Sequence, residues 1–206
     1  MKNTVCVKAA ALLLLLAGLT VRASAQVTVS GGFALSQMDA SGEGFGSVVT
    51  DTGIGGNVYV DYLLPINIPL SVGGEIGVDT AAMKMKHSGL SYKDTITTFP
   101  ILARVAYHFD LMPELDLYVV GKIGISIGLW TGDYIDSIED QNIDIKTPPG
   151  FAFGFDVGAA YYFMPTVGAF VEAGFDRYDR EVEFGRLGSA DVPFNRFLTF
   201  GISVKF

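Results

Sequence analysis

Hydrophobic and polar residues alternate along eight stretches of the chain, and a period of two indicates β-strands. The pattern is clearest in the last ten residues, FLTFGISVKF, where apolar side chains occupy every second position from Leu198 to Phe206. The predicted strands are Val27–Met38, Ile54–Leu64, Leu70–Val78, Phe99–Phe109, Leu117–Trp130, Phe151–Phe163, Val167–Phe175 and Phe197–Phe206. Each has about the 9–11 residues that a tilted strand needs to cross a bilayer, with some overhang.

The connections between these stretches are alternately long and short. The short ones contain proline and cover 65–69, 110–116 and 164–166, whereas the long, polar ones cover 39–53, 79–98, 131–150 and 176–196. This alternation is typical of an up-and-down meander whose two ends lie in different surroundings. The pattern therefore predicts an all-β fold, an eight-stranded antiparallel up-and-down transmembrane β-barrel, with both termini at the short-turn end.

The two parities of the predicted strands differ in charge. One parity carries no charged residue, and the other carries Asp61, Glu75, Arg104, Lys122, Asp156, Glu172 and Lys205. In a soluble lipid-binding barrel the charged parity would face water, whereas in a membrane barrel it would fill the interior. The charged parity is also rich in glycine, which suits a crowded interior. We therefore predict that these seven residues form a charge network in the lumen and that the uncharged parity contacts outer-membrane lipid.

Aromatic residues on the uncharged parity gather near the short turns. They include Tyr62, Tyr107, Phe109, Tyr161 and Phe163. Aromatic belts of this kind mark the membrane–water interface, and a soluble core has no reason to sort its aromatic residues by height. This distribution favours the membrane barrel over the soluble one.

The N-terminus has the features of a secretory signal peptide. MKNTVCVK supplies two lysines, AAALLLLLAGL is a short apolar run, and RASAQ has small residues before a cleavage point between Ala25 and Gln26. The apolar run is too short for a membrane anchor, which needs about 20 residues. We expect residues 1–25 to be the signal peptide and 26–206 to be one outer-membrane barrel domain.

Cleavage would change the charge and remove the single cysteine. Without Lys2, Lys8 and Arg22 the net charge falls from -8 to -11, which argues against a nucleic-acid partner. Loss of Cys6 leaves no disulfide and no thiol chemistry. We expect no cofactor and no metal site. The acidic segment DYIDSIEDQNID lacks the glycine-spaced pattern of a calcium loop and is interpreted as a solvated loop.

These features resemble the small outer-membrane β-barrel family, which includes the OmpA transmembrane domain, OmpX and the opacity-type surface proteins. The resemblance covers 26–206 as architecture and implies a location in the bacterial outer membrane. It also implies that the final strand, with Phe200, Ile202, Val204 and Phe206 on one parity, is similar to the signal read by the barrel-assembly machinery.

Eight strands enclose an interior that side chains can fill. We expect Glu75, Arg104 and Lys122 to form a cluster that Asp156 and Glu172 reach across the lumen, because isolated buried charges are costly. A static plug is the preferred interpretation. The alternative, similar to the exchanging acid–base network of the OmpA barrel, is a narrow gated channel.

The sequence offers little catalytic chemistry. Its two histidines are His87, which lies beside Ser88, and His108, which is expected to face inward without a catalytic partner. We therefore predict that the chain is not an enzyme; a lipid-modifying enzyme is a weaker alternative. The predicted protein is a monomer that serves envelope integrity or surface interaction through four long loops, with lipid, the assembly machinery and a host or surface ligand as partners.

Overall fold

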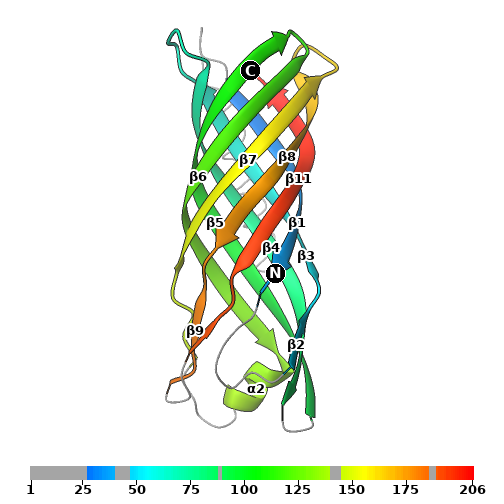
Figure 1. Cartoon of the computed structure of the whole chain (residues 1–206), viewed down its shortest axis with the longest axis vertical. Helices are drawn as coiled ribbons and strands as arrows, with labels where there is room; N and C mark the ends of the chain where they lie inside the picture. Colours follow the sequence, from blue (N-terminus) through cyan, green and yellow to red (C-terminus); the bar gives the residue numbers. More distant parts are fainter. Residues whose placement is uncertain (1–26, 40–46, 88–89, 140–144, 186–188) are drawn as a thin grey trace, which may run out of the picture.

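The computed structural model describes residues 27–39, 47–87, 90–139, 145–185 and 189–206, and within them the chain forms a closed barrel (Figure 1). The predicted signal peptide lies outside the described residues. Eight strands build the wall: β1 (Val27–Met38), β3 (Thr52–Leu63), β4 (Leu70–His87), β5 (Leu90–Met112), β6 (Leu115–Gly132), β7 (Gly150–Tyr162), β8 (Val167–Tyr178) and β11 (Phe194–Lys205).

Each wall strand pairs antiparallel with its neighbours, and the first strand closes the ring against the last. Val29 of β1 lies between Val60 of β3 and Val204 of β11. The closure continues to the final residue, since the amide of Phe206 donates to the carbonyl of Val27 at 2.9 Å. The predicted fold class and all eight predicted strands are confirmed.

Side-chain exposure separates the two parities. On the outer surface Phe33, Ile76 and Phe155 are 71%, 60% and 59% exposed, whereas inward-facing Glu75 and Arg104 are each 1% exposed. The outer surface is apolar and the interior is charged, which is the polarity of a barrel bathed in hydrocarbon. Inward glycines let neighbouring strands come close: a Cβ at Gly124 would collide with the backbone of Ile101.

The hairpin of β4 and β5 extends far beyond the predicted strands. Residues 79–98 were expected to be a loop, but the two strands stay paired from Asp79–Thr98 to His87–Leu90. In this extension the polarity is reversed, because Ala81, Met83 and Ile96 face inward and are buried. Outside the hydrocarbon the outer face can meet water, so the apolar residues move to the inside.

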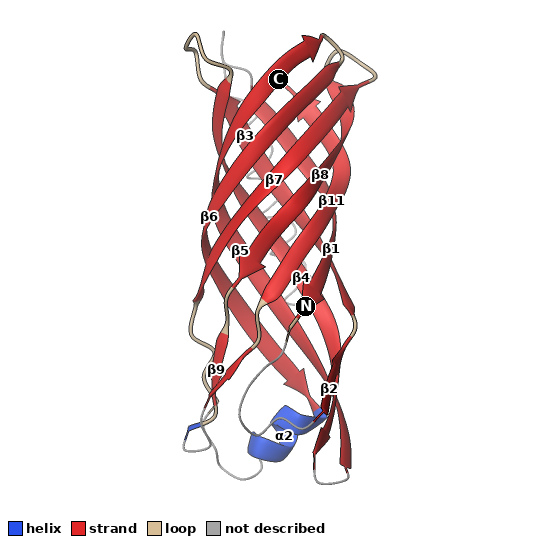
Figure 2. Cartoon of the chain, in the orientation of Figure 1, coloured by secondary structure: helices blue, strands red, loops and turns tan. Residues whose placement is uncertain are grey.

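The other long connections also contain regular structure (Figure 2). Helix α2 (Asp133–Glu139) replaces part of the expected loop 131–150, and strands β9 (Glu181–Glu183) and β10 (Ser189–Asp191) pair within 176–196. Strand β2 (Ser47–Thr50) pairs with β4. Gly132, with φ of 142°, makes the turn from β6 into α2, where a side chain would be strained. The described part of the chain contains no helix long and apolar enough to cross a bilayer.

Candidate functional site

The middle of the lumen is filled by ion pairs, of which Arg104 on β5 makes several. Its Nη1 lies 2.6 Å from Glu75 Oε2, its Nη2 lies 2.6 Å from Glu172 Oε1, and its Nε lies 3.4 Å from Asp61 Oδ1. The guanidinium also stacks 3.7 Å from the ring centroid of Tyr59. The arginine therefore connects β3, β4 and β8 across the interior.

Lys122 on β6 is a second centre of the same network. Its ammonium lies 2.9 Å from Asp176, 3.3 Å from Glu172 and 3.6 Å from Glu75, and it also contacts Asp156. One cation thus faces four carboxylates. The structure brings together the five residues of the expected cluster, from five different strands.

The network also contains charges that were assigned to loops. Arg196 on β11 donates to Glu75 and, at 2.7 Å, to Asp79, and it lies 3.8 Å from Asp176. Among the described residues, the network therefore combines three cations (Arg104, Lys122 and Arg196) with six carboxylates (Asp61, Glu75, Asp79, Asp156, Glu172 and Asp176). All of these side chains are almost completely buried, so the attraction between opposite charges is weakly screened.

At the long-loop end an apolar core fills the barrel. Its buried residues come from the strand ends, from α2 and from the connection between β8 and β11; they include Met38, Ile96, Trp130, Ile135, Val182, Phe184, Val192 and Phe194. Asp94 ties this region together, because it accepts from Trp130 Nε1 at 2.7 Å and from the amide of Tyr134 in α2 at 3.0 Å. The described connections are therefore packed onto the barrel.

One buried cation near this core has no acidic partner among the described residues. The Nη1 atom of Arg180 donates to Thr97 O at 3.1 Å and to Thr98 Oγ1 at 2.8 Å, while its Nε and Nη2 donate to no atom of the residues that the structure describes. Its guanidinium occupies the space above Gly128. Burial without a counter-charge lowers the pKa of Arg180 to about 10.

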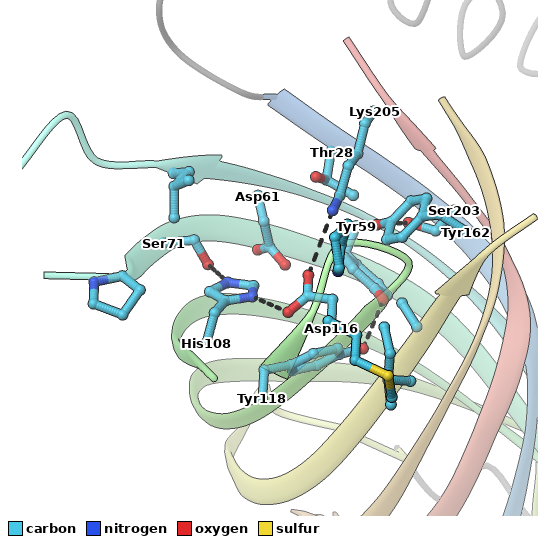
Figure 3. Close-up of a pocket in the computed structure, with 16 residues that line it drawn as sticks. Thr28, Tyr59, Asp61, Ser71, His108, Asp116, Tyr118, Tyr162, Ser203 and Lys205 are labelled. Carbon is cyan, nitrogen blue, oxygen red and sulfur yellow. Dashed lines mark hydrogen bonds and ion pairs between the residues drawn. The ribbon is translucent and has the colours of Figure 1, made fainter. Parts of the chain in front are cut away.

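At the short-turn end an aromatic cluster, with Tyr59, Tyr118, Tyr162 and Phe170, lies beside a cavity of about 470 Å³, which Asp61 of the ion-pair network also lines. Figure 3 shows three polar side chains in a row on its wall. The imidazole of His108 lies between Ser71 and Asp116, with Nε2 2.9 Å from Ser71 Oγ and Nδ1 2.8 Å from Asp116 Oδ1. Lys205 lies 3.8 Å from Asp116 Oδ2.

Three adjacent strands supply this row. Ser71 is the second residue of β4, His108 lies four residues before the end of β5 and Asp116 is the second residue of β6; all three face inward near the short turns. His108 was expected to have no catalytic partner, and the structure instead places it between a hydroxyl and a carboxylate. His87 lies in β4, but its side chain is not among those described. No group of three metal-binding side chains was found among the described residues.

The residues predicted to face lipid are on the outer surface. Tyr62, Tyr107, Phe109, Tyr161 and Phe163 are 36–56% exposed near the short turns. Phe200, Ile202 and Phe206 of the terminal segment are 45%, 50% and 62% exposed. Their side chains are therefore available to lipid or to another protein, while their backbone closes the barrel.

A profile of the outer membrane protein beta-barrel domain family matches residues 9–206. The chain belongs to this family. In outer-membrane barrels the short turns face the periplasm and the long loops face the outside, which orients the apolar core toward the cell surface and the cavity toward the periplasm.

Three solved structures illustrate the similarity. The outer membrane protein OprG from Pseudomonas aeruginosa has a TM-score of 0.64 at 13% identity, covering 89% of this chain and 96% of that one. A major outer membrane protein from Thermus thermophilus has a TM-score of 0.52 at 17% identity, and Neisserial surface protein A has 0.50 at 18%; both cover 89% of this chain and 100% of the other. At these identities the likeness concerns the fold. No curated protein sequence matches the chain.

Proposed function

We propose that the protein is a closed, non-conducting barrel that acts through its long-loop end, in surface interaction and in the integrity of the envelope. The observation that carries this proposal is the filling of the lumen from the long-loop end to the middle of the barrel. The apolar core and the ion-pair network occupy successive levels of the barrel, so the described residues leave the cavity as a blind pocket.

The long-loop end also supports an interaction role, because its described connections are packed. Ile135 of α2 and Phe184 belong to the same buried core as Trp130. Trp130 and Tyr134 both have ring contacts with Phe184, at 5.7 and 6.4 Å between centroids. A surface held in one shape loses little conformational entropy when a partner binds.

A loop replacement tests this role. Residues 181–191 would be replaced by a glycine–serine linker of the same length, and heat-dependent gel migration would confirm that the barrel still folds. We expect cells with this variant to lose attachment to host or mineral surfaces and to become more sensitive to detergent than the wild type. Attachment equal to the wild type would contradict the proposal.

The second candidate, a narrow gated channel, is favoured by the surplus of carboxylates in the lumen. Lys122 faces four of them, so it has alternative partners if one pair opens. In planar bilayers a channel would give discrete conductance steps that Glu75→Ala and Arg104→Ala alter. Silent bilayers containing correctly folded protein would exclude it and support the closed barrel.

A further inference from the structure

The row of Ser71, His108 and Asp116 has the geometry of a nucleophile, a base and an orienting acid (Figure 3). We propose that it is a serine-hydrolase site that cleaves short-chain carboxylic esters arriving from the periplasm. This activity is additional to the proposed surface function, which belongs to the opposite end of the barrel. It also departs from the sequence-based prediction that no residue is catalytic.

The donor and acceptor directions of the two hydrogen bonds are those required for a histidine to activate a serine. An ionised Asp116 can only accept, so it binds the Nδ1–H form of the imidazole. The lone pair of His108 then lies on Nε2, where it accepts the hydroxyl proton of Ser71 at 2.9 Å. Lys205 lies 3.8 Å from the other carboxylate oxygen, Asp116 Oδ2. This is the arrangement in which a base activates a serine.

The cavity gives the serine access to a substrate. Ser71 lines it, and its volume of about 470 Å³ lies within the range of small-molecule sites. Leu63, Pro69, Met112, Pro113 and Leu115 supply apolar wall, which suits a short acyl chain. Lys205 lines the same cavity as a cation, and positive charge there would stabilise a carbonyl oxygen that becomes negative during attack.

The reaction would proceed in two balanced steps. Ser71 Oγ attacks the carbonyl carbon while His108 Nε2 takes the hydroxyl proton; the bond from that carbon to the alcohol oxygen breaks, and the imidazole returns the proton to the leaving alcohol. Water then attacks the acyl-serine, which releases a carboxylic acid and restores the hydroxyl. Ser71 and His108 are the catalytic residues, and Asp116 is a positioning residue.

A purely structural role for these hydrogen bonds, in which they only link three strands, predicts no reactivity at Ser71. A catalytic role predicts a nucleophilic Ser71, so its reactivity distinguishes the two roles. The full chain, folded in detergent and checked by heat-dependent gel migration, would be treated with an alkyl fluorophosphonate, and the adduct located by peptide mass spectrometry. We expect one adduct, on Ser71, and hydrolysis of p-nitrophenyl butyrate. Ser71→Ala should abolish both, and His108→Gln should lower both rates by about 100-fold or more.

Ser30→Ala is the matched control. Ser30 is also a buried inward serine, but its hydroxyl donates to Ser203 Oγ at 2.9 Å and not to an imidazole. This variant should react like the wild type.

Asp116→Asn should lower the rate and alter its pH profile, and Asp116→Glu should restore part of the rate. A merely structural Asp116 would leave the pH profile unchanged.

The wild-type pH profile tests the base without any substitution. The imidazole of His108 contacts Asp116 and the ring of Tyr118 in a cavity that Asp61 and Lys205 also line. Because only the neutral imidazole can accept the serine proton, labelling should depend on pH. Folded wild-type protein that forms no adduct on Ser71 would overturn the proposal. Labelling that is independent of His108 or of pH would overturn it as well.

Discussion

Removal of Arg104 should destabilise the barrel more than removal of any one of its acidic partners. The Arg104 side chain is fully buried and lies within 3.4 Å of three carboxylates. Because the network already has more acids than bases, Arg104→Ala leaves Asp61 without its cation and increases the repulsion among the remaining carboxylates. Breaking a buried ion pair in this way costs about 3–5 kcal/mol.

Glu172→Gln removes a negative charge from the same contacts, whereas Arg104→Ala removes a positive charge. The amide oxygen still accepts from Arg104, and one surplus negative charge disappears, so the expected cost is about 2 kcal/mol or less. Arg177→Ala is the surface control, since its pair with Asp179 is 39% and 44% exposed and is worth about 0–1 kcal/mol.

Equilibrium urea unfolding in lipid vesicles measures all three variants. Trp130 is the single tryptophan and is buried in the apolar core, so its emission reports unfolding. The expected order of free-energy loss is Arg104→Ala, then Glu172→Gln, then Arg177→Ala. If Glu172→Gln costs as much as Arg104→Ala, the surplus of acids does not govern the stability of the lumen.

Three further substitutions, the first with a matched control, test other features of the barrel. Gly124→Val should prevent folding to the heat-resistant form, because its Cβ would meet the backbone of Ile101. Gly121→Val on the same strand is the control and should fold normally, because a Cβ there meets nothing within 4 Å. Equal folding of the two variants would contradict the close approach of the strands at Gly124. Phe206→Ala should change the unfolding free energy by only about 0.5 kcal/mol but reduce the amount of barrel in the outer membrane of cells, and normal amounts in cells would argue against an assembly signal. Arg180→Met should leave the unfolding free energy equal or higher, because the buried guanidinium has no counter-charge among the described residues; a clear loss in the same urea assay would show that it has a stabilising partner.

The period-two pattern predicted the wall because lipid and lumen impose opposite polarities on alternate residues. It failed beyond the hydrocarbon, where Ala81 and Met83 face inward and the outer face is polar, so the β4–β5 extension was interpreted as loop. Asp79 lies on the same parity as Glu75, and this continuation of the charged parity beyond Val78 could have revealed the extension.

Some lumen residues could not be found from parity. Arg196 and Leu198 share one parity, yet Arg196 faces inward and Leu198 is partly exposed, because the register shifts between them in both neighbouring ladders. A β-bulge of this kind reverses the faces of a strand. Likewise, the contact between Ser71 and His108 depends on the stagger of neighbouring strands, which side-chain patterns do not specify.

The accessibility of spin labels at Ile123 and Ile125 shows whether lipid contacts the uncharged parity while the charged parity is enclosed. Both residues lie on the outer face of β6, 57% and 46% exposed. In lipid vesicles we expect their labels to collide with oxygen and not with a water-soluble nickel chelate, whereas a label at Lys84, on the outer face of the β4 extension, should meet the chelate. Labels at Ile123 and Ile125 that meet the chelate but not oxygen would show that water, and not lipid, surrounds the uncharged parity.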